Sequence, residues 1–282
     1  PGYIGALARS ARAHGITVPV FACAGQGDIY GAWGRVDDVV PAMNLYLDSK
    51  LPGLEQGISD YTRILAGFNT PLMITEMGRD NLIMRRFLAS GAKLLGPYNQ
   101  VAGFDFGFTQ GVNNWGDPVS FQTSYYDFLS LITPYGEIRD FITDDRVLSG
   151  FMNSMGELLA GSVIAEGDEI TRYTLKTDSG TPESPPVLSL GGQKDATAVA
   201  VSNLSDAHQL FQLDGCGKSR EIELSPLTSA FVLTNIDLSV WGIPARLDSS
   251  TAEPVYVRTD GDPVIVWQAP IRGRIDLTVD GD

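Results

Sequence analysis

Cysteine and histidine are scarce in this sequence, which contains two residues of each kind. Cys23 and Cys216 fall in parts of the chain with different sequence patterns, so a structural disulfide is not expected and a CxxC-type metal site is excluded. We expect Cys23 to be a small buried residue at the end of a strand. Two histidines support neither a histidine-rich metal site nor a catalytic triad that depends on histidine. Carboxylate chemistry is therefore the most accessible route to catalysis.

Long apolar runs and an excess of positive charge are also absent. No stretch approaches the roughly 20 apolar residues of a membrane helix, and no segment has the basic, apolar and small-residue order of a signal peptide. The chain has 34 acidic and 20 basic residues, and its net charge of −14 repels nucleic acid phosphates and anionic membranes. We expect neither nucleic acid nor a membrane as a partner, and a neutral or cationic ligand fits the charge better.

The apolar residues that are present suffice for a folded protein. With 282 residues and a hydrophobic fraction of 43%, the chain can form one large domain or two ordinary ones, each with a core. It starts with Pro1 and enters a helical pattern at once, so we expect it to be a piece of a longer polypeptide. The localisation, extracellular or cytoplasmic, stays open.

Apolar runs alternate with amphipathic helical patterns over residues 1–161, as is typical of βα units around a parallel sheet. The predicted strands are 17–23, 39–47, 71–76 and 100–108, and the predicted helices are 2–15, 58–68, 81–95 and 144–161. These strands fit either half of an eight-stranded βα barrel or a small, open, doubly wound sheet. No Gly-rich phosphate fingerprint follows the first strand, and polar residues gather where strands end, so we favour a partial TIM barrel containing strands five to eight.

After residue 161 the apolar pattern changes to a period of two, which is typical of strands with one buried face. The predicted strands are 169–176, 196–203, 220–225, 229–235, 254–258 and 273–280, separated by Gly, Pro, Asp and Ser clusters. The fold class is therefore α/β plus all-β. We predict two domains: 1–161, the C-terminal half of a TIM-barrel catalytic domain, and 162–282, an antiparallel β-sandwich accessory domain.

The stretch PLMITE, residues 71–76, is an apolar run that ends in Thr75 and Glu76. In a parallel barrel the strand interior is apolar and the residue at the carboxyl end faces the substrate, so Glu76 stands where a nucleophile or general base would be. A structural alternative stays open: Glu76 is solvated, or it pairs with one of the arginines at positions 79, 85 and 86.

Other predicted strand ends carry polar and aromatic side chains. Aromatic faces stack on the C–H faces of sugars while carboxylates and amides bond the hydroxyl groups, so the clustering of these residues predicts a carbohydrate site. Each aromatic residue on its own is more often part of a core. The candidate substrate-binding residues are Asn44, Tyr46, Tyr98, Asn99, Asp105, Trp115 and Tyr126.

Four stretches carry a resemblance to a known family: YIGALARSARAHGITVPVFACAG, PLMITEM, FLASGAKLLGPYNQVAGFDFGF and TSYYDF. Their order resembles the second half of the catalytic barrel of glycoside hydrolase family 35, the β-galactosidases. The later stretches ELSPLTSAFVLTNI and SSTAEPVYV resemble the β-domain that follows the barrel in bacterial members. The similarity covers most of the chain. The family's Gly-Gly-Thr-Asn-Phe becomes AGFDF, with Asp105 in place of the amide, and this difference bears on galactose specificity.

The resemblance implies a retaining glycoside hydrolase of carbohydrate metabolism that releases terminal β-linked galactose, with Glu76 as the nucleophile. It implies that Asn44, Tyr98 and Tyr126 hold ring hydroxyls and that Tyr46 and Trp115 line the pocket. The family's acid/base glutamate, in an Asn-Glu pair, falls upstream of Pro1, so this fragment alone is expected to be inactive. No metal or organic cofactor is implied. The expected partners are a carbohydrate substrate and the remaining N-terminal half of the barrel.

Two other interpretations stay open. The first is a non-catalytic carbohydrate-binding or scaffold protein with a degenerate barrel. The second is a hydrolase of another barrel family that places its nucleophile in the same way but acts on a different β-glycoside.

Overall fold

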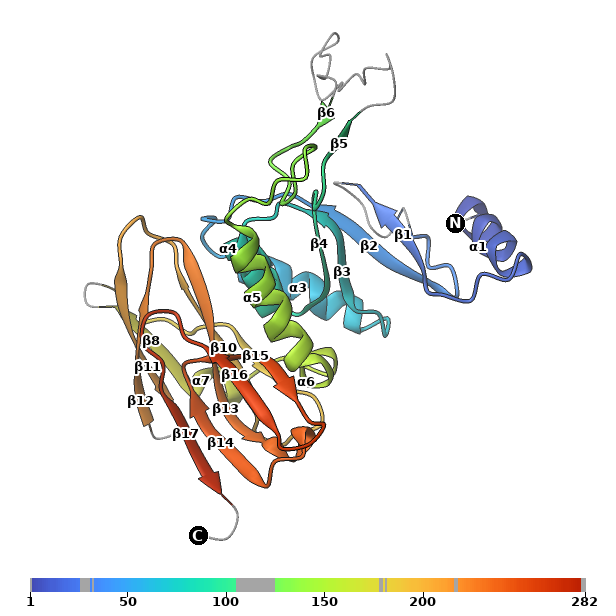
Figure 1. Cartoon of the computed structure of the whole chain (residues 1–282). Helices are drawn as coiled ribbons and strands as arrows, with labels where there is room; N and C mark the ends of the chain where they lie inside the picture. The colour runs from blue at the N-terminus through green and yellow to red at the C-terminus, as the bar shows by residue number, and fades with distance from the viewer. Residues whose placement is uncertain are drawn as a thin grey trace.

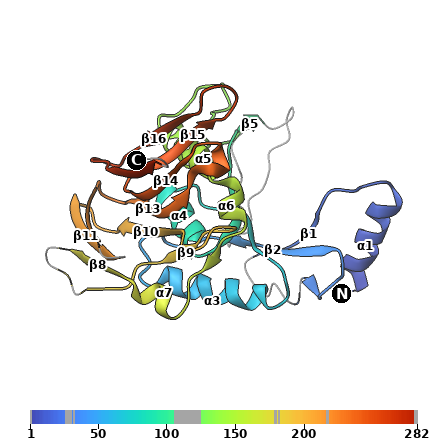
Figure 2. The ribbon, with the colours of Figure 1, turned by 90° about the horizontal axis from the view of Figure 1, so that it is seen from below.

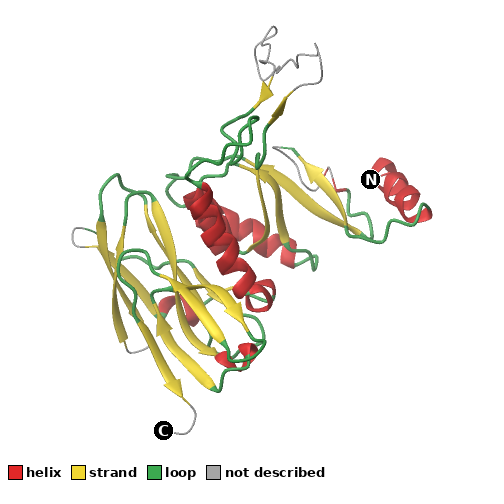
Figure 3. Cartoon of the chain, viewed as in Figure 1, coloured by secondary structure: helices red, strands yellow, loops and turns green. Residues whose placement is uncertain are grey.

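The computed structural model describes residues 2–25, 31, 33–104, 125–177, 180, 182–215 and 218–279, with the backbone alone at 125 and 126. The chain forms a mixed α/β structure in which a four-stranded parallel sheet is followed by antiparallel sheets (Figure 1). Figure 3 shows that the longer helices belong to the first part of the chain and most of the strands to the second.

The parallel sheet has the strand order β1–β2–β3–β4. Its strands are β1 (Val20–Ala24), β2 (Val39–Leu45), β3 (Leu72–Met77) and β4 (Ala92–Pro97). Helices α1 (Gly2–Ala13), α3 (Leu54–Ala66) and α4 (Asn81–Ala89) precede β1, β3 and β4. Because all three strand pairings are parallel, the carboxyl ends of the four strands lie at one edge of the sheet.

Helices α3 and α4 bury one face of this sheet. Leu72, Ile74 and Met77 of β3 are almost fully buried in the same apolar cluster as Leu65 of α3 and Phe87 of α4. Complete burial of a side chain of this size stabilises the fold by roughly 1.5 to 3 kcal/mol. The apolar run that predicted a strand at 71–76 therefore contributes buried residues to this cluster.

The fourth strand lies earlier than the sequence predicted. The predicted helix over 81–95 ends at Ala89, and Gly91 then takes a φ of 91°, which glycine adopts readily after a helix. Residues 92–97 form β4 instead. The predicted strand over 100–108 is described only as far as residue 104. In that part, residues 103–104 form the short strand β5 (Gly103–Phe104), and Val101 makes an isolated bridge to Ile132. Strand β5 pairs in antiparallel with β6 (Tyr125–Tyr126).

The predicted closing helix over 144–161 consists of two helices, α5 (Ile142–Ser154) and α6 (Gly156–Ala160). Gly150 allows α5 to approach β15 (Glu253–Arg258), because a Cβ at this position would lie 2.4 Å from the carbonyl oxygen of Val255. Helices α4 and α5 thus lie between the parallel sheet and the later strands (Figures 1 and 2).

The later strands pair in antiparallel. A six-stranded sheet has the order β17–β14–β13–β10–β9–β7, a three-stranded sheet has the order β12–β11–β8, and β15 pairs with β16. Their bounds are β7 (Val163–Ile164), β8 (Tyr173–Thr177), β9 (Val187–Ser189), β10 (Thr197–Asn203), β11 (Gln209–Gly215), β12 (Lys218–Leu224), β13 (Thr228–Asp237), β14 (Ala245–Ser250), β16 (Val264–Gln268) and β17 (Ile275–Val279). Two short helices, α7 (Asp168–Thr171) and η1 (Leu238–Trp241), precede β8 and β14.

The predicted strands after residue 161 overlap β8, β10, β12, β13, β15 and β17. Strand β8 starts later than the predicted strand over 169–176, because α7 occupies the first residues of that range. Five strands were missed by the sequence analysis, namely β7, β9, β11, β14 and β16.

One apolar cluster joins the two parts of the chain. Phe151 of α5 stacks on Phe231 of β13 with 5.3 Å between ring centroids, and neither ring is exposed to solvent. The same cluster contains residues of β3, α4, β10 and β14. A second cluster lies between the six-stranded and three-stranded sheets and includes Val199, Phe211 and Ile222. Unfolding the later sheets would therefore expose the side of α4 and α5 that faces them.

Candidate active site

Strand β3 carries an extra residue near its carboxyl end. On the β2 side, Met43 faces Ile74 while the next residue, Asn44, faces Glu76, so Thr75 has no partner of its own. The register with β4 also shifts between Ile74 and Met77. A bulge of this kind bends a strand and changes the direction of the side chains next to it. It brings Glu76 beside Asn44.

Gly96 of β4 allows this irregularity. A Cβ on Gly96 would lie 2.3 Å from the backbone oxygen of Thr75 and 2.7 Å from its carbonyl carbon, so only glycine fits there. The close approach of β4 therefore helps to set the backbone path immediately before Glu76.

Replacing Gly96 by alanine should push Thr75 away from β4 and move Glu76 with it. We expect a loss of about 1 to 3 kcal/mol in the free energy of unfolding, as for other overpacked interiors, measured by urea denaturation. Gly57→Ala in α3 is the matched control, because a Cβ there meets no atom within 4 Å and should be neutral or stabilising. Equal stability of Gly96→Ala and the unsubstituted chain would contradict the role given to Gly96.

Both oxygens of the Glu76 carboxylate accept a hydrogen bond. Asn44 donates from Nδ2 to Oε2 at 2.9 Å, and Tyr46 donates from Oη to Oε1 at 2.8 Å. The Glu76 side chain is half-buried, whereas Tyr46 is 41% exposed. Two donors on different oxygens fix the rotation of the carboxylate plane, so the group is held in one orientation while still accessible to solvent.

The orientation of the Asn44 side chain is fixed in turn by Cys23 of the neighbouring strand β1. Its Oδ1 accepts a hydrogen bond from the thiol of Cys23 at 3.0 Å, so its Nδ2 is directed at Glu76. The hydroxyl of Thr75 lies 3.0 Å from the same sulfur and donates to the backbone oxygen of Met43 at 3.2 Å. The prediction that Cys23 is buried is wrong. It is exposed at the carboxyl end of β1, and its thiol belongs to the polar chain that ends at Glu76.

The arginines near Glu76 in the sequence bond to other groups in the described part of the chain. Arg85 pairs with Glu253, and Arg86 pairs with Glu55. Arg79 donates to the backbone oxygens of residues 99 and 128. The structural alternative in which Glu76 serves as the partner of a neighbouring arginine therefore loses its support.

Tyr98 and Asn99 follow the end of β4, because that strand lies earlier than predicted. The backbone N–H of Tyr98 donates to the backbone oxygen of Met77 at 2.8 Å, so Tyr98 sits at the same edge of the sheet as Glu76. The side-chain oxygen of Asn99 is buried and accepts no hydrogen bond from the described residues.

The predicted site residues therefore fall into three groups. Asn44, Tyr46 and Glu76 are in direct contact. Tyr98 and Asn99 lie at the same edge without a hydrogen bond to Glu76 among those found in the described residues. Asp105 and Trp115 lie outside the described residues, and Tyr126 is described only as part of β6.

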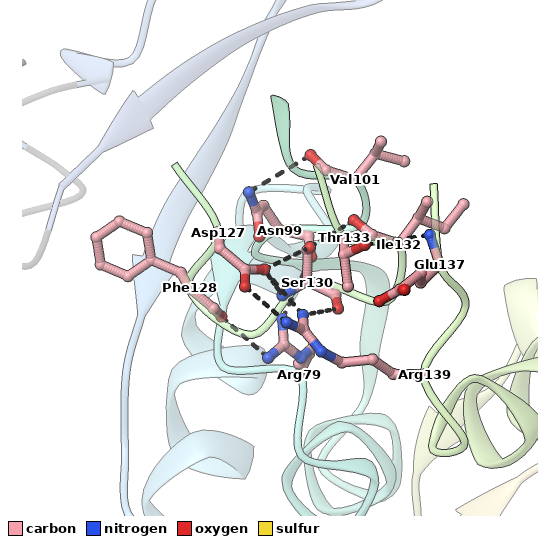
Figure 4. A network of polar contacts seen from close by, with 10 residues as sticks. All are labelled: Arg79, Asn99, Val101, Asp127, Phe128, Ser130, Ile132, Thr133, Glu137 and Arg139. Atoms are coloured by element: carbon pink, nitrogen blue, oxygen red, sulfur yellow. Dashed lines mark hydrogen bonds and ion pairs between the residues drawn. The ribbon is translucent and has the colours of Figure 1, made fainter. Parts of the chain in front are cut away.

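A network of polar contacts holds the loop that follows β4 and β6 (Figure 4). Arg139 donates to both carboxylate oxygens of Asp127, at 2.8 and 2.6 Å, and Ser130 donates to Asp127 at 2.9 Å. These donors, Arg139 first, hold the pKa of Asp127 far below its usual range. Phe128 and Leu129, which lie between Asp127 and Ser130 in the sequence, have φ values of 45° and 56°. This backbone region is strained for large side chains. The network thus stabilises a loop conformation that local preference opposes.

Asp145 in the first turn of α5 is a second electrostatic feature near this loop. Burial raises its pKa to about 6, Asp144 adds to the shift, and Asn81 and Arg79 oppose it. Because the unfolded pKa is about 3.9, the folded chain binds the proton more tightly, and stability should fall as pH rises from about 4 to 6. The side-chain amide of Asn81 also donates a hydrogen bond to the backbone oxygen of Asp144 in α5.

We expect Asp145→Asn to raise the free energy of unfolding at pH 7 by about 1 kcal/mol, after allowance for solvent screening of a half-buried group. The gain should vanish below about pH 4, where both states are protonated. Urea denaturation at several pH values measures it, with Asp140→Asn, an exposed position in the preceding turn, as the control. A gain that does not depend on pH would contradict the assignment.

Comparisons with known proteins add no family to this description. No protein-family model matches the chain, and no curated protein gives a significant match. Among the described residues, no helix has the length and apolar content needed to cross a membrane.

Proposed function

We propose that this chain is the C-terminal half of a βα-barrel catalytic domain, with its following β-sandwich domain, from a retaining β-galactosidase-like hydrolase of glycoside hydrolase family 35. The observation that supports this proposal most strongly is the fixed carboxylate of Glu76 at the carboxyl edge of a parallel sheet. In βα barrels, catalytic groups are found at that edge. The choice of a terminal β-galactoside as the substrate comes from the four stretches that resemble the family.

In the proposed reaction, Glu76 attacks the anomeric carbon of a terminal β-galactoside. A bond forms between a Glu76 oxygen and this carbon while the bond to the leaving-group oxygen breaks, and a second carboxylic acid protonates that oxygen. Water then attacks the glycosyl-enzyme, the second group takes its proton, and Glu76 is released. This mechanism needs the two carboxyl groups roughly 5 to 5.5 Å apart, so the acid/base glutamate must come from the other half of the barrel.

Asn44 and Tyr46 have a positioning role in this proposal. Each donates to a different oxygen of Glu76, so one oxygen can bond to the sugar while the other keeps its donor. Donors fixed before the reaction cost no reorganisation during it. Tyr98, which follows the end of the neighbouring strand, and Tyr126 are proposed to hold the ring hydroxyls. Trp115 is proposed to line the pocket, and Asn99 and Asp105 to contact the substrate.

The proposal is tested by trapping the intermediate in the full-length protein. A 2-deoxy-2-fluoro-β-galactoside with a good leaving group should form a long-lived glycosyl-enzyme, because the fluorine destabilises the oxocarbenium-like transition states. Peptide mass spectrometry should find the label on Glu76. A label on any other residue would reject the nucleophile assignment. Labelling by the corresponding glucoside in preference to the galactoside would instead assign a different sugar.

A further inference from the structure

A cavity of about 600 Å³ lies beside the loops that follow β3 and β4. Arg79 in its wall follows β3, Phe141 immediately precedes α5, and Asp144 lies in the first turn of α5. The opposite wall comes from the antiparallel sheets, with Thr228 at the start of β13 and Gln268 at the end of β16. The cavity thus has walls from both parts of the chain, on the side of the sheet where α/β proteins bind ligands.

Two charged residues in the lining of the cavity, Arg85 and Glu253, already have hydrogen-bond partners. Arg85 donates to both oxygens of Glu253, at 2.6 and 2.9 Å, and the side chains of this pair are 6% and 4% exposed. Glu253 also accepts a hydrogen bond from the backbone N–H of Phe231 at 2.8 Å. These two side chains therefore need no ligand as a partner, and they hold their part of the lining in place.

Other lining residues have oxygen atoms that can still accept hydrogen bonds. Within the described part of the chain, the carboxylate of Asp144 and the side-chain oxygen of Gln268 accept none. Phe141 supplies an aromatic wall with 39% of its area exposed, and the guanidinium of Arg79 lies 5.2 Å from the centre of its ring. Open acceptors beside an aromatic face are the arrangement that binds a sugar ring.

The charge of the lining disfavours anionic ligands. Four carboxylates (Asp80, Asp144, Asp145 and Glu253) outnumber two guanidinium groups, so an anion such as a phosphate would be repelled. No group of three His, Cys, Asp or Glu side chains suited to a metal ion occurs among the described residues. The volume falls within the range of roughly 300 to 1,000 Å³ that is usual for small-molecule sites. A neutral compound rich in hydroxyl groups fits these conditions.

We propose that this cavity binds a saccharide unit. This proposal rests on the lining of the cavity itself and does not depend on the proposed function. The hydroxyl groups of the ligand donate to Asp144 and Gln268, and one face of its ring packs on Phe141.

Calorimetric titration of the 282-residue chain with β-1,4-galactotriose tests the proposal. We expect Phe141→Ala and Asp144→Asn each to weaken binding about tenfold, equivalent to about 1.4 kcal/mol. Tyr135→Ala is the matched control, because this aromatic residue is 73% exposed and lies outside the cavity, so its affinity should be unchanged. Asp144→Asn replaces an exposed side chain by one of the same shape, which keeps the test informative if Phe141→Ala fails to fold.

Three outcomes would overturn the proposal: no binding of galactotriose, equal affinity in the cavity variants and the unsubstituted chain, or an affinity that falls only with Glu76→Gln. Failure of the proposed function is recognised separately, because it appears as absence of the fluoro-sugar label from Glu76. If the label is absent and galactotriose still binds through Phe141 and Asp144, the cavity is a saccharide site of a different protein class.

Discussion

Replacing Glu76 by glutamine should lower the turnover of β-galactosides by the full-length protein by at least about 10⁴-fold, as expected for loss of a covalent nucleophile. An amide cannot form the glycosyl-enzyme. Initial rates with nitrophenyl β-galactoside measure the effect.

Glu76→Asp separates the chemistry of the carboxylate from its position. This variant keeps the charge but shortens the reach by one methylene, and a displacement of about 1 Å can cost about 10²-fold in rate. The aspartate variant should therefore be slow, yet faster than the glutamine variant. Equal activity in both variants would show that the carboxylate does no chemistry.

Glu76→Ala provides a chemical test of the same role. Azide can enter the space left by the side chain and attack the anomeric carbon from that side, forming a C–N bond as the leaving group departs. The expected product is the α-galactosyl azide, since one displacement inverts the β-configuration. Adding azide should therefore restore turnover of the β-galactoside by the Glu76→Ala variant through formation of that product. A variant that is as active as the unsubstituted protein without azide would contradict the proposal.

The sequence predicted that Glu76, Asn44 and Tyr46 gather at one rim of the sheet, for a simple physical reason. Parallel strands bring their carboxyl ends to one edge, so side chains at the ends of PLMITE and MNLYL were expected to be near neighbours. The structure confirms this for Asn44, Tyr46 and Glu76. It could not be predicted that Cys23 orients Asn44, because a thiol in an apolar run resembles any small core residue.

The bulge at Thr75 was beyond sequence reasoning. It depends on the close approach of Gly96, which belongs to a strand that sequence analysis placed elsewhere. That error has a local cause, because apolar residues continue at helical spacing from residue 81 to 95. Gly91 was the visible signal for the end of the helix, and only the packing of Ala92 in the core decides for a strand.

The missed antiparallel strands show the same limit. Strand β11 exposes Leu210 and buries Phe211 and Leu213, so its apolar residues do not alternate cleanly in the sequence. Its strand character comes from pairing with β8 and β12 on either side. Tertiary partners thus decide the state of a segment whose own pattern is weak.

Replacing Glu253 by glutamine should lower the free energy of unfolding by about 3 to 5 kcal/mol, because it leaves the buried charge of Arg85 without its counter-ion. Asp206→Asn is the matched control. Its pair with Lys50 also joins the two parts of the chain, but these side chains are 82% and 43% exposed, and such pairs contribute about 1 kcal/mol or less. Urea denaturation measures both changes.

Adding Arg85→Met to Glu253→Gln should recover part of the loss, since the buried charge is then gone and the glutamine oxygen can still accept from the Phe231 backbone. Arg85 belongs to α4 and Glu253 to β15, and the apolar cluster around them spans both parts of the chain. The two parts should therefore unfold in one transition that moves as a whole in every variant. Two transitions, of which Glu253→Gln shifts only one, would contradict a shared core and would also remove the common walls on which the saccharide cavity depends.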